Sequence, residues 1–311
     1  MWTLSAFQVK AEAARLGFSA CGLAPAEPVQ DFAVTAYRRW IAQGRHGEMH
    51  YLDDHEAKRM DPRLLVEGAR TVVSLALNYY PPTRQAEDSY QIACYAYGKD
   101  YHEVVKAKLQ QLLDTLSNLA PQGESLQGRA FCDTAPVMEK YWAWRAGLGW
   151  IGKHTQLVIP QAGSHFFLGE LILTAPADTY DQPQADRCGR CTRCMDACPS
   201  HAIVAPRSLD AARCLSYQTI EYRGELSPEV AHQMGNTIYG CDRCLQACPW
   251  NRFATPTHET AFHPRSQLLE MSVADWESLS VEDYRKLFQG SAVKRAKYEG
   301  LKRNIQALKR S

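Results

Sequence analysis

The sequence predicts an α/β domain over residues 1–177, a cysteine-rich domain over residues 178–255 and a helical, basic segment over residues 256–311. Three observations predict this order. Strand patterns alternate with helix patterns through the first 175 residues, which is typical of an α/β domain. Eight of the 11 cysteines then lie between Cys188 and Cys248, and the C-terminal stretch combines helical spacing with a run of lysines and arginines.

The elements of the first domain follow from the spacing of apolar residues. Helices are expected where apolar residues share one helical face, over residues 5–16, 32–43, 100–119 and 138–146. Asp61-Pro62 suits a cap followed by a first-turn proline, so a short helix is expected over residues 62–68. Strands are expected where short runs are uncharged and rich in β-branched or aromatic residues, over residues 18–23, 71–77, 128–132, 157–159 and 166–173.

The remaining elements lie beyond a linker at residues 176–183. After Pro249 the pattern turns helical again, and Ser280 to Asp283 resembles a capping box. Hydrophobic content of 45% and charged content of 22% are ordinary for a globular protein. The net charge of +1 provides no global field toward nucleic acid or membrane, so such binding would need local patches. With no signal-peptide pattern and no membrane-spanning run, we expect a cytoplasmic, monomeric enzyme.

Two cysteine runs dominate the middle of the chain. The first is Cys188-x-x-Cys191-x-x-Cys194-x-x-x-Cys198-Pro199, and the second is Cys241-x-x-Cys244-x-x-x-Cys248-Pro249. The first run is the bacterial ferredoxin pattern, in which three cysteines hold one [4Fe–4S] cube and the fourth reaches a second cube. The second run is one ligand short, and Cys214 between the runs can supply it. The predicted ligand sets are therefore Cys188, Cys191, Cys194 and Cys248 for one cube, and Cys198, Cys214, Cys241 and Cys244 for the other.

Zinc is the alternative occupant of such a site, because Cys-x-x-Cys pairs also bind zinc. Three cysteines at successive x-x gaps with Cys-Pro after x-x-x are unusual for zinc, and eight ligands divide evenly between two crossed cubes. Disulfides are less expected in a large chain without a secretion signal. Two cubes carry single electrons and need an acceptor cofactor in the first domain. The chain has neither a dinucleotide fingerprint nor a phosphate loop, so flavin and cobalamin both remain possible.

Beyond the cysteines, several motifs occur in an order that resembles one known family. They are Arg59-x-Asp61-Pro62, Tyr95-Ala-x-Gly98-x-Asp100-Tyr-His102, Cys132-Asp-Thr-Ala-Pro136, Gly149-Trp-Ile-Gly-Lys-His154, Gly163-Ser-His-Phe-Phe-Leu-Gly-Glu170, and Lys294-Arg295 with Lys302-Arg303-Asn304. With the cysteine block, they make the chain similar to the bacterial epoxyqueuosine reductases. The resemblance implies a cobalamin-binding α/β domain, related to cobalamin-processing and reductive dehalogenase domains, fused to a ferredoxin domain with two [4Fe–4S] clusters.

That family reduces epoxyqueuosine to queuosine at the wobble position of tRNA, the last step of queuosine biosynthesis. The resemblance therefore implies base-off cobalamin, two [4Fe–4S] clusters, a tRNA partner and an external one-electron donor. Removal of the epoxide oxygen needs two electrons and a proton donor, and the resemblance gives the acid role to Asp133. The residue pattern alone favours a helix cap there. A working acid would need a raised pKa, which burial beside a corrin would provide.

The remaining candidates surround these centres. We expect Arg59, Asp133, His154, His165, Ser216 and Asp242 to contact the cobalamin. Substrate contacts are expected from Glu221, Arg223, Lys294, Arg295, Lys302 and Arg303, the last four on the basic tail. A solvated helix face is the simpler reading of that tail. Two rival functions remain: a reductive dehalogenase acting on a small molecule, and an electron-transfer subunit that needs neither a corrin nor an acid.

Overall fold

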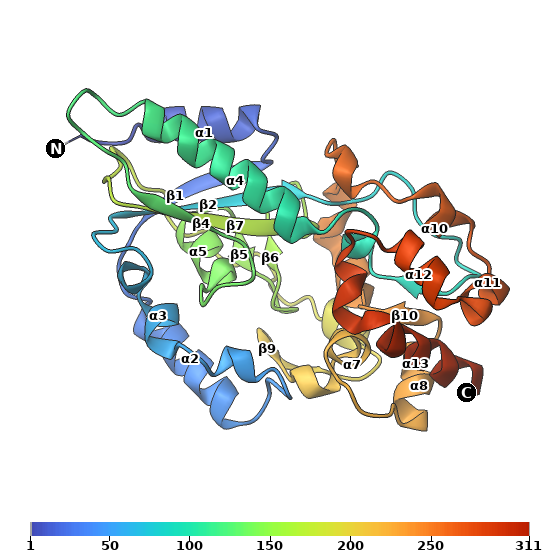
Figure 1. The fold of residues 1–311 in the computed structure, drawn as a ribbon. Helices are drawn as coiled ribbons and strands as arrows, with labels where there is room; N and C mark the ends of the chain where they lie inside the picture. The colour runs from blue at the N-terminus through green and yellow to red at the C-terminus, as the bar shows by residue number, and fades with distance from the viewer. Residues whose placement is uncertain (1, 311) are drawn as a thin grey trace.

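A four-stranded antiparallel sheet forms the centre of the N-terminal part in the computed structural model, which describes residues 2–310 (Figure 1). Its order is β1-β2-β7-β4, with bounds Ala20–Pro25, Thr71–Asn78, Phe166–Leu173 and Gly128–Phe131. β2 and β7 pair along their whole length, from Thr71 opposite Leu173 to Asn78 opposite Phe166. The α/β class is confirmed, although the sheet is antiparallel.

Helices cover both faces of this sheet because its central strands are apolar on both sides. Along β2, Val73, Leu75 and Leu77 enter one core with α1 (Ala6–Arg15) and α4 (Tyr101–Asn118). Val72 and Ala76 enter a second core with α5 (Glu139–Arg145). Successive strand residues point to opposite faces, which explains this division. Figure 1 shows α1 and α4 on one side of the sheet and α5 on the other.

The predicted helices of this part are confirmed within a residue or two, together with α2 (Asp31–Ala42). The exception is residues 62–68, where only a 3₁₀ turn forms over Pro62–Leu64. Asp61 is extended and its carboxylate accepts from the Arg63 N–H, so it starts the turn but no longer helix follows. A short helix that the sequence did not predict, α3 (Glu56–Met60), lies directly before it, after a 3₁₀ turn at His50–Leu52.

The cysteine-rich part consists of short elements between the cysteines. Helix α6 (Arg193–Asp196) starts one residue before Cys194, and α9 (Arg243–Gln246) starts one residue before Cys244. The two helices pack against each other. Around them lie the hairpin β8–β9 (Ile203–Ala205 and Ser208–Leu209), α7 (Leu215–Ile220), α8 (Pro228–Met234) and β10 (Thr237–Tyr239). A second hairpin, β5–β6 (Trp150–Ile151 and Leu157–Val158), precedes β7.

The C-terminal segment is helical, as predicted. It contains α10 (Ser266–Glu270), α11 (Val273–Ser278), α12 (Val281–Leu287) and α13 (Lys297–Arg310), with a 3₁₀ turn at Ala292–Ala296. Ser280 caps α12 by accepting from the Asp283 N–H. The reciprocal capping box, however, forms one helix earlier, between Ser272 and Asp275.

One pairing joins sequence-distant segments. β3 (Gln91–Ile92) pairs in parallel with β10, so the stretch that follows Tyr79 runs among the C-terminal helices (Figure 1). One apolar core extends from Leu4 through Trp276 to Leu308. The domain boundaries at residues 177 and 255 stay predictions. The stretch that follows Tyr79 nevertheless lies beside the C-terminal part in space.

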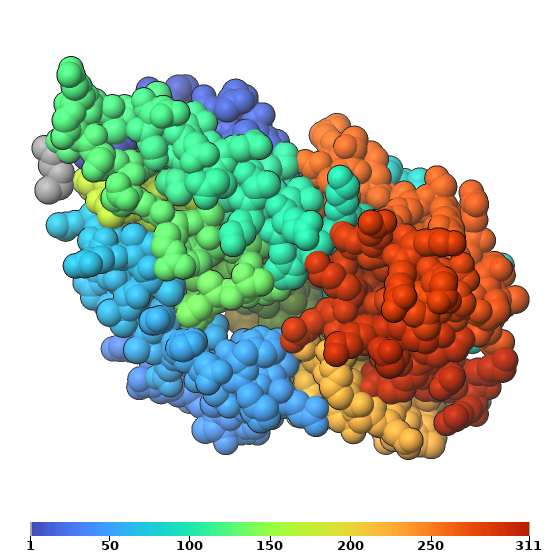
Figure 2. Space-filling view, in the orientation of Figure 1, coloured from blue at the N-terminus to red at the C-terminus, as the bar shows by residue number. Residues whose placement is uncertain are grey.

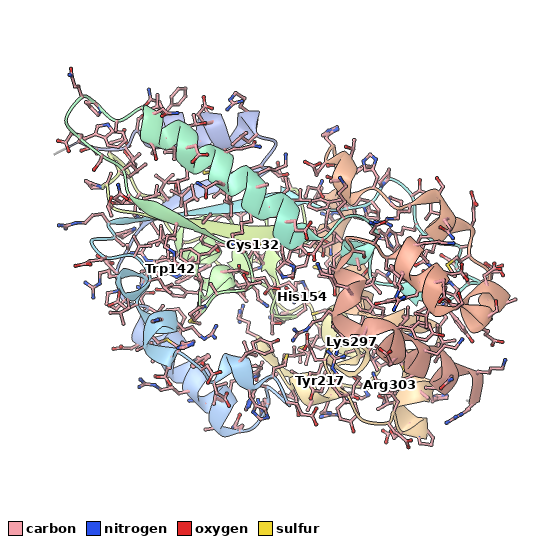
Figure 3. The ribbon with its side chains drawn as sticks, in the orientation of Figure 1. Cys132, Trp142, His154, Tyr217, Lys297 and Arg303 are labelled. Carbon is pink, nitrogen blue, oxygen red and sulfur yellow. The ribbon has the colours of Figure 1, made fainter. Side chains whose placement is uncertain are left out.

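A hollow opens on the face drawn in Figure 2, between the α2 region, the α5 region and the C-terminal helices. Residues of the predicted site lie around it: Figure 3 labels His154 and Cys132, the neighbour of Asp133, close to this hollow. Among residues 2–310, no helix is long and apolar enough to span a membrane.

Candidate active site and iron–sulfur sites

The first predicted cysteine set lines one pocket. Cys188, Cys191, Cys194 and Cys248 face it together, with Pro249 and Trp250 from the second run and Lys153 and His154 from the β5–β6 hairpin. Lys153 Nζ donates to the carbonyl oxygens of Gly189 and Cys191 at 2.8 and 2.9 Å, which holds the ligand loop against the hairpin. Cys248 belongs to the other run, so the four cysteines predicted to share one cube lie around one pocket.

The thiols of the second set also lie close together. Burial raises the pKa of Cys244, and the neighbouring thiols of Cys241, Cys214 and Cys198 raise it further. Burial also raises the pKa of Cys241 to about 11. Crowded buried thiols resist ionisation unless a cation binds them, and a bound metal deprotonates its thiol ligands outright. Both sets therefore fit thiolate-bound iron, and the exchange of cysteines between the runs fits two cubes better than two separate zinc sites.

Asp133 stands at the end of β4, in a strained turn. Its φ is +57°, a left-handed conformation that is uncommon for residues other than glycine. Its Oδ2 accepts a hydrogen bond from the Tyr101 hydroxyl and lies 3.1 Å from His102 Nε2. The N-cap of α5 is Met138, so Asp133 is not the helix cap that the residue pattern alone favoured. Its side chain is 55% exposed, which leaves the carboxylate open to a substrate.

A chain of charged groups continues behind Asp133. His102 Nδ1 lies 2.7 Å from Asp100 Oδ1, and Lys294 Nζ lies 2.8 Å from Asp100 Oδ2. The Asp100 side chain is 4% exposed, so its charge is compensated inside the protein by these two cations. Tyr101 is held by stacking on Phe167, with ring centroids 4.3 Å apart and planes 4° apart. Tyr101 and His102, at the start of α4, thus orient the Asp133 carboxylate from two sides.

The pKa of Asp133 corrects one expectation. Burial raises it, but hydrogen bonds from His102 and Tyr101 outweigh burial and hold the pKa below its ordinary value. The proton sits instead on His102. Burial lowers the pKa of His102, yet hydrogen bonds to Asp100 and Asp133 raise it to about 9. Asp133 and His102 therefore act as a pair that holds one proton near pH 7.

This pair predicts a pH-dependent stability. Because the folded pKa of His102 is about 9 against an ordinary value of 6.5, its protonation stabilises the fold fully below pH 6.5. That contribution disappears as the pH rises through about 9. The difference in Tm between the wild type and His102→Gln should therefore be largest near pH 6 and shrink toward pH 9. Lys106→Gln, an exposed change on the same helix, is the control. Tm differences that do not vary with pH would refute the protonated pair.

Two further carboxyl groups near Asp133 were not predicted, the partly buried Glu139 and the buried Glu170. Glu139 accepts the Asp133 backbone N–H, which fixes the turn. Burial and the charge of Asp133 raise the pKa of Glu139 to about 8. Glu170 on β7 is 0% exposed and bonds to Ser74 at 3.2 Å. Burial keeps its pKa well above the ordinary value, so it is neutral. Glu170 ended a motif above, but no pattern in the sequence indicated that either group lies near the acid.

Several buried polar atoms of the predicted cobalamin residues and a neighbouring tryptophan lack a partner among residues 2–310. They are Arg59 Nε, Trp150 Nε1, His154 Nε2 and both ring nitrogens of His165. Burial lowers the pKa of His154 and of His165 to about 4, so both imidazoles are neutral. His154 Nδ1 accepts from the Gln156 N–H, which leaves Nε2 as an unused donor. A buried donor without a partner costs about 1–3 kcal/mol, and a bound group rich in amides would satisfy it.

These orphaned groups fit cobalamin, whose amide side chains and phosphate offer acceptors and donors. Arg59, His154 and His165 would hold it, as predicted, although His154 also borders the first cysteine pocket. Ser216 and Asp242 have internal roles. Against the effect of burial, the Ser216 N–H lowers the pKa of the Cys214 thiol, and Asp242 accepts the Cys94 N–H at 2.7 Å. Their contact with a corrin stays a prediction.

Three of the predicted substrate residues, Glu221, Arg223 and Arg295, contact one another. Arg295 pairs with both carboxylate oxygens of Glu221, at 2.6 Å from Nη2 and 2.9 Å from Nε. The same guanidinium lies 5.7 Å from the centre of the Tyr51 ring. Arg223 donates to the Arg295 carbonyl at 2.9 Å and supports that turn. The structure therefore brings Glu221, Arg223 and Arg295 together, beside an N-terminal loop.

Two cations of the tail bond to the chain itself. Arg303 donates to the carbonyl oxygens of Tyr222, Gly224 and Gln218 at 2.7, 2.7 and 2.8 Å. Lys302 Nζ donates to the Glu277 carbonyl at 2.6 Å. These side chains hold α13 in place, and the expected substrate contacts of Arg303 and Lys302 stay a prediction. Lys294 is occupied by Asp100, as described above. The sequence showed the charges but not the carbonyl groups that they meet.

Arg303→Met should therefore act on stability. It leaves three carbonyl groups without their donor, and we expect the free energy of unfolding to fall by about 2–3 kcal/mol. Lys297→Met is the matched control, because Lys297 is exposed at the start of the same helix (Figure 3). Urea unfolding followed by circular dichroism measures both. Equal stability of the two variants would return Arg303 to the substrate surface.

Comparison with known families agrees with this geometry. Residues 59–134 match the family model described as Epoxyqueuosine reductase QueG, DUF1730, and residues 187–251 match the 4Fe-4S double cluster binding domain. An epoxyqueuosine reductase of Cellulophaga algicola is 48% identical over 301 residues, covering 97% of each chain. That of Pseudomonas aeruginosa is 42% identical, covering 93% of this chain and 81% of the relative.

Solved structures show the same likeness. A crystal structure of epoxyqueuosine reductase with an epoxyqueuosine-modified tRNA-Tyr stem loop matches with a TM-score of 0.84 and 28% identity, over 97% of this chain and 80% of that chain. The Bacillus subtilis enzyme, described with its catalytic aspartate loop swung out of the active site, matches with a TM-score of 0.86 and 26% identity over the same shares.

Proposed function

This chain belongs to the epoxyqueuosine reductases, and we propose that it reduces epoxyqueuosine to queuosine at the wobble position of tRNA with cobalamin and two [4Fe–4S] clusters. The observation that carries the proposal is the Asp133 carboxylate, which Tyr101 and His102 hold at the end of β4 with 55% of its side chain exposed. The reaction would complete queuosine biosynthesis. Mature tRNA is a cytoplasmic substrate, so the proposal also places the enzyme there.

The cofactors have distinct places in this proposal. Arg59, His154 and His165 would hold base-off cobalamin, and the eight cysteines would hold the two cubes. When bound and reduced, cobalamin supplies an electron-rich cobalt centre next to the epoxide. Against the effect of burial, the nearby charges of Glu139, Asp133 and Cys244 raise the pKa of Lys140, which supports placing the second cube near the acid.

The residues of the chain control the proton. Epoxide removal consumes two electrons and two protons and yields the alkene and water. His102 holds a proton at Nε2, 3.1 Å from Asp133 Oδ2, and Asp133 passes it to the epoxide oxygen. Asp100 keeps the histidine charged and oriented, and Lys294 holds the second carboxylate oxygen of Asp100. The neutral Glu139 fixes the backbone of Asp133 in its strained turn, so that the carboxylate faces the substrate.

Substrate binding would depend on the group formed by Glu221, Arg223 and Arg295. Glu221, Arg223 and Arg295 would border the flipped nucleoside, as expected for enzymes that act on a base outside its stack. Arg295 and exposed cations such as Lys297 would meet the anticodon phosphates. Lys302 and Arg303 hold α13 in position, and their substrate contacts stay a prediction.

The test is direct. Anaerobically reduced protein, reconstituted with iron, sulfide and cobalamin, is incubated with tRNA that carries epoxyqueuosine. Nucleoside mass spectrometry should show loss of one oxygen and appearance of queuosine. The same tRNA with unreduced protein is the control. Persistence of epoxyqueuosine in the presence of fully loaded, reduced protein would refute the proposal.

A further inference from the structure

The loop of the first cysteine set carries an exposed cluster of arginines. Arg187, Arg190 and Arg193 alternate with Cys188, Cys191 and Cys194 along the chain, and all three arginines are exposed. Within residues 2–310, the structure gives none of their guanidinium groups an ion pair or a hydrogen bond to a carboxylate or carbonyl group. Unpaired exposed cations in one short loop form a local positive field on a chain whose net charge is only +1.

The acidic residues of the same loop do not pair with these arginines. Asp186 pairs with Arg207 of the β8–β9 turn and also accepts the Cys188 N–H at 2.8 Å. Asp196 accepts from the Thr192 hydroxyl at 2.8 Å. The loop therefore satisfies its carboxylates internally and presents its guanidinium groups to solvent.

The position of this cluster is specific to the first cysteine set. The residues beside Cys188 and Cys191 are exposed. Beside the second set, Arg213 and Ala197 are also exposed, but Leu215 and Leu245 are buried. The loop around Cys188 and Cys191 is thus a place where an external protein can approach the first set.

We infer that Arg187, Arg190 and Arg193 form the docking surface for an acidic protein that carries one electron at a time. This inference rests on the proposed function. Each turnover needs two electrons. Either two reduced carrier molecules each give one electron to the first cluster and leave oxidised, or one carrier is reduced twice and gives one electron each time. The opposing charge of the partner brings it to this loop, and complementary charge acts mainly on association.

RNA is the other polyanion that could meet such a cluster. The position favours the carrier, because the arginines are sequence neighbours of the cysteines that line the thiol pocket, and none of them contacts the Asp133 carboxylate that the nucleoside must reach. A phosphate contact here would serve binding alone, whereas a carrier needs this place to shorten the path of the electron.

The experiment compares two reductants on the reconstituted full-length enzyme. The probe protein is a reduced, acidic flavodoxin, and the small reductant is reduced methyl viologen, a cation. In Arg187→Glu/Arg190→Glu/Arg193→Glu, we expect the KM for flavodoxin to rise about tenfold or more at low salt, while viologen-driven formation of queuosine is unchanged or faster. Raising the salt concentration should raise the KM of the wild type for flavodoxin and leave the KM of the variant nearly unchanged.

A matched triple variant controls for net charge. Arg39→Glu/Lys106→Glu/Arg285→Glu changes the same charge at exposed positions away from the cysteines and should keep the wild-type KM for flavodoxin. Iron content reports intact clusters. An unchanged KM in the loop variant, or a salt-independent wild type, would overturn the inference. So would a loss of tRNA affinity alone, which would assign the loop to RNA. If viologen fails to drive turnover of the wild type, the proposed function fails instead.

Discussion

Asp133→Asn should lower kcat for epoxyqueuosine reduction by about 10²–10⁴ fold, because the amide can accept a hydrogen bond but cannot pass a proton to the epoxide oxygen. The change is nearly isosteric, and Tyr101 and His102 can still orient the side chain. Cobalamin binding and iron content should remain at the wild-type level. The measurement is single-turnover conversion of modified tRNA, with nucleoside mass spectrometry as the readout.

The control for this change is Asp114→Asn, which removes a carboxylate from the exposed face of α4, where it accepts from Gln110. It should leave turnover unchanged. Wild-type turnover in Asp133→Asn would contradict the acid role and would direct attention to Glu139, whose raised pKa near 8 makes it the next group able to hold a proton at neutral pH.

Cys244→Ser should abolish turnover by removing a ligand of the second cube. We expect iron to fall from about eight atoms to about four per chain, because each cube needs its four cysteines. The first cube should still accept electrons, so its visible absorbance should bleach on reduction while epoxyqueuosine persists. Reduction of the first cube without formation of queuosine would show that electrons must pass through the second cube.

The matched control is Cys21→Ser, since Cys21 lies on β1, outside both sets, where burial raises its pKa to about 12. It should retain all iron and full activity. Circular dichroism of both variants separates loss of a cluster from loss of the fold. Normal turnover of Cys244→Ser with half of the iron would contradict the path through the second cube.

The cysteine sites could be predicted from sequence because local spacing decides them. A ligand every third residue wraps one metal body, and the longer gap before Cys248 favoured its place in the set of the other run, whose pocket it lines. The central strands and α4 could be predicted for a related reason, since burial on one or two faces leaves a periodic pattern. Residues 62–68 were mispredicted because Arg63 binds Asp61 through its own side chain, a local competition that periodicity does not reveal.

The tail and the acid show what local patterns cannot supply. Arg303 looked like a phosphate contact because its partners, the carbonyl groups within and just after α7, are 79–85 residues away in the chain. The lowered pKa of Asp133 depends on Tyr101 and His102, which α4 brings to the end of β4 from more than 30 residues upstream. Glu170 stayed unnoticed as a buried acid, since a single glutamate in a strand does not reveal which face it occupies.

The most direct test of the central claim is a cobalamin titration of protein already loaded with iron and sulfide. The account predicts stoichiometric binding with the absorbance change of base-off cobalamin, weakened at least tenfold in His154→Phe/His165→Phe, which removes the orphaned imidazole donors. Protein that carries its full iron content yet leaves the cobalamin spectrum unchanged would contradict the account.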